Sequence, residues 1–498
     1  MTAQPVDLSA LDRLGLPVEE AVPAVRSALA DDGTAVLQAE PGAGKTTAVP
    51  LRLLDEPWLA DRRILVLEPR RVAARAAARR MSALVGDRVG GLVGVRTRDD
   101  TRVGPDTRIE VITEGVLTRR IQHEPELDDV GAVVFDEFHE RSLTVDLGLA
   151  LALDVRGALR PDLRLLVMSA TIDVDRVAGL LGGDGGPAPV ARAPGRLHPI
   201  TVAWRPRAAR DPLAPAVADA VRAVLAEREG DVLAFLPGAA EIRRSARLLS
   251  GARDAAGRAV AIRPLYGALP AAEQDLALTA EPDRTRVVLA TDIAETSLTV
   301  DGVRSVVDSG LTRAPRFDPG SGMTRLTTLS ISRASAEQRA GRSGRLAPGH
   351  VVRLWSEAEH AGRRTHTDPE IVAVDLASFV LDAAVWGERD PTRLALLDPP
   401  PAPALDEARS LLRQLGALGD DGVPTAAGRR MAELPVHPRL GALLETARAR
   451  DQGWTACVIA AVLEERDVLR GRIDERPVDL DVRLALVDDP RRPDPRAD

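Results

Sequence analysis

Two short motifs place phosphate-binding and metal-binding side chains at the ends of predicted strands. The first follows an apolar run at 34–38 and opens a predicted helix; its residues are Gly42, Ala43, Gly44, Lys45, Thr46 and Thr47. Backbone N–H groups at a helix N-terminus bind phosphate, the lysine reaches the β- and γ-phosphates, and the following hydroxyl reaches Mg²⁺. The pattern G-x-x-x-x-G-K-[ST] is met except at its first position, Ala39. The motif predicts a nucleotide site, and an ordinary glycine-rich strand-to-helix turn is the alternative.

Lys45 is the only lysine in a chain with 66 lysine and arginine residues and no asparagine. Such a bias indicates pressure on composition, under which an exposed lysine is replaced by arginine at little cost. A compact ammonium fits a phosphate loop as a point charge, whereas the planar guanidinium is too wide. The single lysine therefore supports the phosphate-binding interpretation.

The second motif is a pair of carboxylates, Asp136 and Glu137, directly after the apolar run 132–135. In phosphate-loop enzymes the acid at the strand end holds Mg²⁺ and the next carboxylate polarises the attacking water. We therefore expect Thr46, Asp136 and Glu137 to organise the metal and the water. His139 is expected to link the nucleotide to the neighbouring domain, and simple packing at the strand end is its alternative role.

Hydroxyl and guanidinium groups further along the chain complete the predicted site. Ser169 and Thr171 end another predicted strand, from which they can report the phosphate state to the acidic motif. In the stretch QRAGRSGR, residues 338–345, Arg342 and Arg345 are three positions apart, so we expect both to project from one helical face as arginine fingers. A solvated basic helix is the alternative, which the two glycines of the stretch disfavour.

Composition restricts the classes of protein that can carry this site. A chain of 498 residues is too long for a single core. No run approaches the roughly 20 apolar residues that a membrane span needs, and the N-terminus lacks a signal pattern. Cys457, the only cysteine, is expected in the core, and the lack of an intrachain disulfide suits a reducing cytoplasm. The net charge of −8 disfavours a wholly basic surface but leaves room for a basic groove between domains.

The elements that must position these residues alternate between strands and helices. Apolar runs predict strands in two groups: 34–38, 64–68, 109–113, 132–135 and 165–168, then 232–236, 261–265, 287–290, 303–308 and 351–355. This spacing predicts two tandem α/β domains with mainly parallel sheets. From residue 368 onward helical patterns dominate, 415–425 reads as a helix end and a glycine turn, and the tail 488–498 is expected to be disordered.

With these motifs in this order, the chain resembles superfamily-2 helicases of the DEAH/RHA group, and within it the bacterial HrpB-type helicases. The matching stretches are AEPGAGKTT, LEPRRVAARAAARRM, TEGVL, DEFHER, SAT, LAFLPGAAEI, TDIAETSLTVDG and QRAGRSGR, within a resemblance that covers about residues 11–469. It implies RecA-like domains at 1–203 and 204–357, a winged-helix domain at 358–434 and the start of a helical ratchet domain at 435–498. Relatives continue further, so we expect a piece of a longer protein.

The resemblance also assigns roles to individual residues. Gln338, Arg342 and Arg345 would close over the γ-phosphate from the second domain. Arg80 would stack on the nucleotide base, and Leu278 replaces the usual aromatic on its other face, so base selectivity should be weak. The residues that would line the sugar–phosphate backbone of a nucleic-acid strand are Arg70, Arg71, Thr113, Glu114, Gly115 and Thr291.

Two further features follow from the resemblance. Asp292 stands where many relatives have asparagine, and the stretch 311–332 reads as a hairpin that would wedge against a strand junction or would be a plain surface hairpin. The predicted function is ATP-driven and Mg²⁺-dependent movement, 3′→5′ along single-stranded RNA, in the cytoplasm. A nucleic-acid-stimulated NTPase that remodels RNA without efficient unwinding and a DNA-directed helicase are the alternatives.

Overall fold

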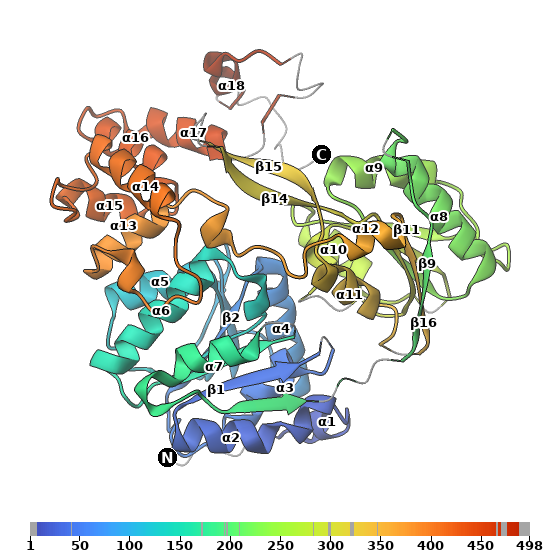
Figure 1. The fold of residues 1–498 in the computed structure, drawn as a ribbon, viewed down its shortest axis with the longest axis horizontal. Coiled ribbons are helices and arrows are strands. Elements are labelled where there is room, and N and C mark those ends of the chain that lie inside the picture. Colours follow the sequence, from blue (N-terminus) through green and yellow to red (C-terminus); the bar gives the residue numbers. More distant parts are fainter. Residues whose placement is uncertain are drawn as a thin grey trace. The chain divides into compact units, whose positions relative to one another are not determined.

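The computed structural model describes residues 7–487, apart from residues 41, 171–172, 194, 196–197, 209, 282, 297–299, 319–322, 346, 465–466 and 470–475. The chain divides into two compact units (Figure 1). The first unit comprises Met1–Val374 and Ala395–Asp398, and the second comprises Asp375–Leu394 and Pro399–Asp498. All the motifs singled out above lie in the first unit.

The first α/β domain is built on an eight-stranded sheet with the order β4-β3-β5-β2-β6-β7-β1-β8. Its neighbouring strands are parallel except for β3 and β4, which are antiparallel. The strands are β1 (Thr34–Ala39), β2 (Arg63–Glu68), β3 (Val93–Arg96), β4 (Thr101–Arg102), β5 (Ile109–Thr113), β6 (Val130–Phe135), β7 (Arg164–Ser169) and β8 (Val190–Ala193). The helices are α1 (Ser9–Asp12), α2 (Val22–Asp31), α3 (Lys45–Arg52), α4 (Arg71–Leu84), α5 (Glu114–His123), α6 (Leu143–Ala158) and α7 (Val174–Gly182), with 3-10 turns η1 (Pro17–Glu20), η2 (Phe138–Glu140) and η3 (Gly183–Gly185).

The central strands of this sheet are apolar along their whole length. Every residue of β6 is buried, and β2 is buried from Ile64 onward. Parallel strands are joined by crossover helices that cover both faces of the sheet, so neither face of a central strand meets solvent. This is why the sequence shows continuous apolar runs here instead of alternation.

The second α/β domain has a six-stranded, fully parallel sheet with the order β11-β12-β10-β13-β16-β9. Its strands are β9 (Ile200–Trp204), β10 (Asp231–Phe235), β11 (Ala261–Leu265), β12 (Arg286–Ala290), β13 (Val303–Asp308) and β16 (Gly349–Arg353). Its helices are α8 (Leu213–Glu227), α9 (Ala239–Leu248), α10 (Ala271–Leu278), α11 (Arg333–Gly341) and α12 (Glu357–Ala361), with 3-10 turns η4 (Asp292–Ala294) and η5 (Glu370–Val372). Two RecA-like domains in tandem are therefore confirmed.

Each predicted strand is present, but short strands were missed. The strand β9 pairs with β16 in the register Ile200↔Gly349, so the predicted domain boundary at 203 falls inside a strand of the second sheet. β3 and β8 were also missed, because each is four residues long and contains glycine or arginine. Runs this short are not distinguishable from loops by periodicity.

A two-stranded antiparallel hairpin extends from the second domain. It consists of β14 (Leu311–Asp318) and β15 (Met323–Ser330), paired from Leu311↔Ser330 to Asp318↔Met323. The two predicted strand runs of the stretch 311–332 are confirmed, while the turn between them lies outside the described residues.

The second unit is helical. Its helices are α13 (Ala377–Trp386), α14 (Ala402–Gln414), α15 (Ala426–Glu433), α16 (Pro438–Arg448), α17 (Gly453–Glu464) and α18 (Leu480–Val487), with the 3-10 turn η6 (Pro391–Arg393). An isolated antiparallel bridge, Leu418↔Pro424, closes the predicted glycine turn, and this is consistent with a winged-helix module.

The expectation that Cys457 is buried was wrong. Cys457 is exposed on α17, a helix that is apolar around most of its circumference. Ala456 and Ala460 are buried on this helix, whereas Trp454 is 79% exposed. An apolar sequence pattern that covers all faces of a helix does not show which face is buried.

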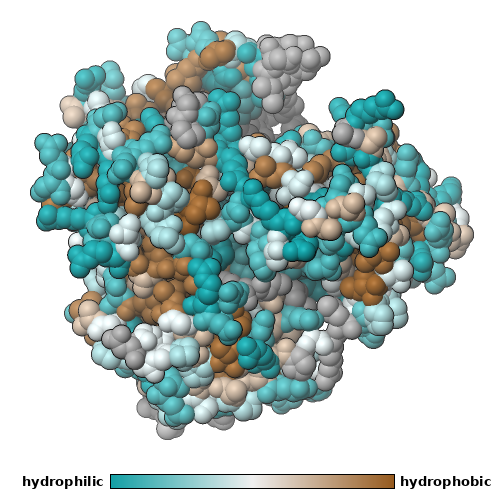
Figure 2. Space-filling view, in the orientation of Figure 1, coloured by the Kyte–Doolittle hydropathy of each residue, from teal (hydrophilic) through white to brown (hydrophobic). Residues whose placement is uncertain are grey.

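The face of the molecule in Figure 2 is mostly hydrophilic, with hydrophobic residues in separate patches. Among the described residues, no helix has the length and apolar character that would let it cross a membrane.

Candidate active site

The six predicted residues Gly42–Thr47 span the end of the loop between β1 and α3 and the first turn of α3. Gly42 and Gly44 have φ angles of 88° and 91°, in the left-handed region that favours glycine. A Cβ atom added at Gly44 would lie 2.6 Å from Cδ1 of Leu16, so a side chain there would displace Leu16. The helix α3 begins at Lys45, and the loop therefore presents a helix N-terminus, whose first backbone donors have no acceptor within the helix.

Lys45 is buried and faces the acidic motif. Its Nζ donates a hydrogen bond to Oε1 of Glu137 at 2.8 Å and lies 3.8 Å from Oδ1 of Asp136. Burial alone would lower the pKa of Lys45, but the charges of Glu137 and Asp136 outweigh burial and leave this pKa raised. A planar guanidinium is wider than an ammonium, so we expect that it would not fit beside these two carboxylates.

Thr46 and Asp136 form a donor pair that fits magnesium. The Thr46 hydroxyl donates to Oδ2 of Asp136, and the backbone N–H of Glu137 donates to Oδ1 of Asp136 at 2.8 Å. Burial raises the pKa of Asp136 to about 6, against the opposing charge of Lys45, and a dication would favour its ionised form. Magnesium prefers oxygen ligands and keeps several waters. The described residues contain no group of three or more His, Cys, Asp or Glu arranged for a metal.

Glu137 directly precedes the 3-10 turn Phe138–Glu140 and has an unusual backbone conformation. Its φ angle of 49° is in the left-handed region, which costs a non-glycine residue about 1 kcal/mol or more. Although burial favours the neutral acid, the charges of Lys45 and His139 lower the pKa of Glu137 to about 2. Its Oε2 is buried, accepts no hydrogen bond and lies 3.4 Å from Nδ1 of His139. The side chain is therefore an ionised base with one oxygen able to accept a proton.

Two predicted residues of the second domain reach this loop and the phosphate loop. The Gln338 amide nitrogen lies 2.8 Å from Nε2 of His139, which places His139 at the contact between the domains. Arg345 lies over the phosphate loop, because a Cβ atom added at Gly42 would be 3.3 Å from its Nε. Arg345 and Gly42, which are about 300 positions apart in the sequence, thus meet at the phosphate loop.

Arg342 is buried beside these residues. Its Nε donates to the backbone carbonyl of Glu295 at 2.9 Å, and its terminal nitrogen donates to the carbonyl of Thr296. The helix α11 ends at Gly341, and the chain turns through Arg342 and the following residues. The prediction that Arg342 and Arg345 share one helical face was therefore wrong; they approach the cleft from a helix end and a turn.

The two arginines create a local excess of positive charge. Burial and the adjacent Arg345 lower the pKa of Arg342 well below the usual arginine range, and burial lowers that of Arg345 to about 10. A guanidinium keeps its proton in proteins, so the shifts express the free-energy cost of two neighbouring buried cations. An anion with several charges, such as a triphosphate, would relieve that cost.

Ser169 lies at the end of β7, opposite Gln38 of β1 in the sheet register. It is fully buried, and its hydroxyl has no hydrogen-bond partner. Thr171 lies outside the described residues. The coupling role of both hydroxyls stays a prediction.

Glu68 is a further carboxylate at the site that sequence reasoning missed. It ends β2, is 1% exposed, and its Oε2 has no hydrogen-bond partner. Burial and the charges of Asp136 and Glu137 raise its pKa well above the ordinary range. Its position at the end of a buried apolar strand, as for Asp136, was the available signal.

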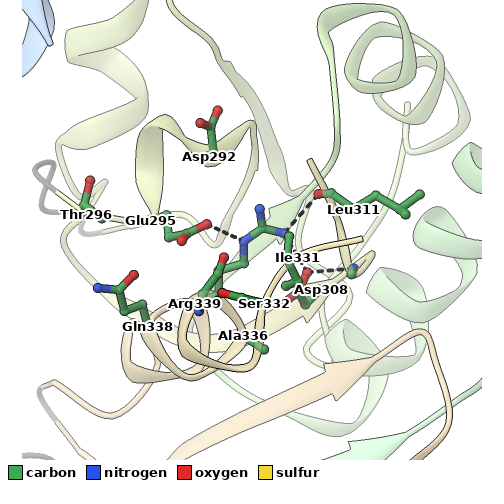
Figure 3. Close-up of polar contacts among 12 residues, drawn as sticks. Asp292, Glu295, Thr296, Asp308, Leu311, Ile331, Ser332, Ala336, Gln338 and Arg339 are labelled. Carbon is green, nitrogen blue, oxygen red and sulfur yellow. Dashed lines mark hydrogen bonds and ion pairs between the residues drawn. The ribbon is translucent and has the colours of Figure 1, made fainter. Parts of the chain in front are cut away.

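Arg339 is the second residue that was missed, and it forms the centre of a buried network (Figure 3). Its Nε donates to Oε2 of Glu295 at 2.8 Å, and a terminal nitrogen donates to Oδ1 of Asp308 at 2.9 Å and to the carbonyl of Leu311 at 3.2 Å. The guanidinium also lies 4.7 Å from the ring centre of Phe235. Because Glu295 holds Arg339 by its side chain and Arg342 by its carbonyl, it joins the cleft to the base of the hairpin.

The residues predicted to hold the nucleotide base lie on two helices. Arg80 is exposed on α4, and Leu278 is partly buried at the end of α10. These helices are joined across the domains by the Arg79–Asp275 ion pair, whose atoms are 2.8 Å apart. The stacking role of Arg80 stays a prediction.

The predicted nucleic-acid contacts lie at the carboxyl ends of strands. Arg70 joins the two domains, since its guanidinium lies 3.0 Å from Asp292 and 3.3 Å from Glu140. Arg71 is exposed and forms an ion pair with Asp99. The pairing with Arg70 gives a physical role to the aspartate at position 292.

Thr113 ends β5 and precedes α5, while Gly115 is exposed in the first turn of that helix, with open space around its Cα. Thr291 directly follows β12. A cavity of about 940 Å³ lies between the domains, and its lining includes Arg70, Asp292, Arg313, Arg316, Ser332 and Arg363. The role of these residues in strand binding stays a prediction.

Comparison with known proteins agrees with this geometry. Residues 19–179 match the DEAD/DEAH box helicase family, and residues 216–347 match the helicase conserved C-terminal domain. The ATP-dependent RNA helicase HrpB of Escherichia coli is 45% identical over 90% of this chain and 55% of that protein. The pre-mRNA-splicing factor ATP-dependent RNA helicase prp22 of Schizosaccharomyces pombe is 35% identical over 87% of this chain and 37% of that protein.

Solved structures give the same result. The crystal structure of Escherichia coli DEAH/RHA helicase HrpB has a TM-score of 0.85 at 45% identity and covers 91% of this chain and 57% of that chain. A second crystal structure, of Escherichia coli DExH-box NTPase HrpB, has a TM-score of 0.81 and covers 91% and 55%.

A phosphate loop on one RecA-like domain, closed by arginines from a second, defines the motor core of superfamily-2 helicases, and the chain belongs to their DEAH/RHA group. Within this group it is similar to bacterial HrpB over most of its length. The chain spans just over half the length of that relative and 37% of the Schizosaccharomyces pombe relative.

Proposed function

We propose that the chain is the motor part of an ATP-dependent RNA helicase, which moves 3′→5′ along single-stranded RNA and unwinds or remodels it. The observation that carries the proposal is the meeting of Lys45 and Glu137 with Arg345 of the second domain around one phosphate loop. The names of the relatives support ATP and RNA as substrates.

In the proposed hydrolysis, water attacks the γ-phosphorus and the bond to the β,γ-bridging oxygen breaks, giving ADP and phosphate. Glu137 is ionised and therefore able to polarise the water and accept its proton. In the structure, Nζ of Lys45 donates a hydrogen bond to Oε1 of Glu137. Phosphates would attract this ammonium and release Oε1 of Glu137 for the water.

The remaining charges act on the γ-phosphoryl group. Arg342 and Arg345 stabilise negative charge on its oxygens, while Gln338 helps to close the cleft through His139. Bound magnesium, held by Thr46 and Asp136, would neutralise charge on the phosphates. Ser169 and Thr171 would couple closure of the cleft to the nucleic-acid track.

Recognition of the strand would rest on its sugar–phosphate backbone. Arg70, Arg71, Thr113, Gly115 and Thr291 offer guanidinium, hydroxyl and amide donors, which do not read sequence. Such a track needs no basic coat, which reconciles it with the net charge of −8. A cytoplasmic location is part of the proposal and rests on the single cysteine.

A nucleic-acid-stimulated NTPase without efficient unwinding is the second candidate, because one similar structure is described as an NTPase. Strand displacement on matched 3′-tailed RNA and DNA duplexes, with ATP hydrolysis measured in parallel, separates these functions. We expect RNA to stimulate hydrolysis and the RNA duplex to be displaced. Stimulation without displacement would favour the second candidate, and preference for DNA would favour a DNA helicase. Hydrolysis that no nucleic acid stimulates would contradict all three.

A further inference from the structure

In the loop that follows Asp136, successive residues contact different parts of the first unit. Glu137 binds Lys45 of the phosphate loop, and His139 lies against Gln338 of the second domain. Glu140 accepts hydrogen bonds from Thr296 and Arg70. These contacts serve the proposed motor function. The last residue of the loop, Arg141, makes a separate set of contacts.

Arg141 is a buried arginine with a φ angle of 51°, so left-handed residues stand at both ends of the turn Phe138–Glu140. Its guanidinium forms a bidentate pair with Asp146 of α6, at 3.0 and 2.9 Å. A terminal nitrogen of the same guanidinium lies 2.8 Å from Oδ2 of Asp398. A non-glycine residue keeps this backbone conformation only where its surroundings fix it, and these ion pairs do so.

Arg176 holds Asp398 from the other side. It lies on α7, the helix that follows the Ser169 loop, and it is half exposed. Its terminal nitrogen lies 2.9 Å from Oδ1 of Asp398 and also donates to the carbonyl of Leu397. Asp398 is thus held by two arginines, Arg141 from the loop after Asp136 and Arg176 from the first turn of α7.

A second chain segment is held at the same place. The backbone N–H of Glu370 donates to the carbonyl of Arg141 at 3.0 Å. The Glu370 carboxylate accepts from the backbone N–H of Leu143 at 3.0 Å, at the start of α6. Arg141 therefore binds one segment through its side chain and another through its backbone.

These two segments are the connections to the second unit. Glu370 lies just before Asp375, where the second unit begins. Residues 395–398 belong to the first unit and separate the two segments of the second unit, Asp375–Leu394 and Pro399–Asp498. We infer that Arg141 and Arg176, through Asp398, are positioning residues that anchor the connections of the second unit to the catalytic loop. This inference rests on the proposed function: RNA bound by the full chain would stimulate hydrolysis at Glu137 through the contacts of Arg141 and Arg176 with Asp398.

The test compares Asp398→Asn with Asp162→Asn. Asp162 is a matched control, because it also pairs with two arginines of the first domain, Arg160 and Arg62, but lies in the turn before β7. Arg176→Ala is the second test variant, because this half-exposed side chain can be removed without opening the core. ATP hydrolysis is measured with and without poly(U) RNA, and RNA affinity is measured without nucleotide.

We expect Asp398→Asn and Arg176→Ala to lose RNA stimulation by roughly tenfold, in the range of coupling between sites, with basal hydrolysis unchanged. The loss should persist at saturating RNA, which separates it from a change in RNA affinity, because Arg176 and Asp398 line the same cavity as Arg70. Stimulation equal to that of the wild type, an equal loss in Asp162→Asn, or a parallel loss of basal hydrolysis would overturn the inference.

Hydrogen exchange of the amides at 138–142 tests the anchor without RNA. Asp398→Asn should accelerate this exchange severalfold, whereas Asp162→Asn should not. Unchanged exchange would overturn the anchor. If RNA fails to stimulate the wild type while Asp398→Asn still accelerates exchange, then the proposed function fails and the anchor stands.

Discussion

Replacement of Arg342 by alanine tests whether the second domain completes the active site. A guanidinium about 4 Å from a unit charge contributes roughly 4 kcal/mol at the effective dielectric constant of 20 that suits partly buried sites. This corresponds to about 10³-fold in rate, the order that an arginine finger supplies. We therefore expect hydrolysis by Arg342→Ala to fall by about three orders of magnitude.

The same substitution also changes stability, because Arg342 binds the carbonyls of Glu295 and Thr296. Each buried carbonyl left without a donor costs about 1–3 kcal/mol, so the loss at both carbonyls should lower the free energy of unfolding by about 2–6 kcal/mol. Arg353→Ala is the matched control: Arg353 is a buried arginine of the same domain that binds the Ala336 carbonyl and Glu337. It should lose stability and keep hydrolysis.

The assay is single-turnover hydrolysis with saturating RNA, at a temperature where both variants are folded by circular dichroism. RNA binding without nucleotide should change little in Arg342→Ala, because its track is lined by other residues. A single-turnover rate within a few-fold of the wild type would refute the reasoning, as would an equal fall in Arg353→Ala.

Three other changes follow from the site. Lys45→Arg should keep the charge and abolish turnover, by about 10³-fold, since the space beside Glu137 lacks room for the planar fork; near-normal hydrolysis would contradict this explanation of the single lysine. Glu137→Gln should bind Mg-ATP yet lose hydrolysis by about 10²–10⁴-fold, the range of a general base, and equilibrium binding of a fluorescent ATP analogue tests the first half; loss of binding would make Glu137 a structural residue. Burial raises the pKa of Glu114 to about 8, although Ser142 donates a hydrogen bond to it. The folded state therefore holds this proton longer than the unfolded state, so the wild type loses stability as pH rises from about 5 to 8. Thermal melting should show Glu114→Gln close to neutral at pH 5 and stabilised by about 4 kcal/mol at pH 8.5, whereas a constant difference would refute the raised pKa.

Much of the first unit follows from its sequence for physical reasons. Central parallel strands such as β6 are buried on both faces, so they appear as continuous apolar runs, and their carboxyl ends meet at one edge of the sheet. The placement of Lys45 beside Asp136 and Glu137 was therefore predictable from the strand ends. Which of the two carboxylates accepts the hydrogen bond of Lys45 was not predictable, because side-chain contacts depend on loop backbone angles such as the left-handed φ of Glu137.

Other features depend on tertiary contacts that leave weak local signals. The strand β9 is as long as several predicted strands, but it is the edge strand of its sheet and is only partly buried, so only pairing with β16 defines it. Arg339 looks like its neighbouring arginines in the sequence, yet its guanidinium is buried between the carboxylates of Glu295 and Asp308. The end of α11 at Gly341 was misjudged because helical spacing was extended through two glycines, where helix propensity is low.

The single lysine has a practical consequence beyond nucleotide chemistry. A protease specific for lysine has one cleavage site in this chain, the bond between Lys45 and Thr46, and Lys45 is only 4% exposed. Cleavage must wait for local opening of the phosphate loop, so under mild digestion the appearance of fragments 1–45 and 46–498 measures how often that loop opens. A ligand that binds only the closed loop would slow cleavage by the factor 1 + [L]/Kd. The chain thus carries, without labels or mutations, its own reporter of occupancy at the phosphate loop.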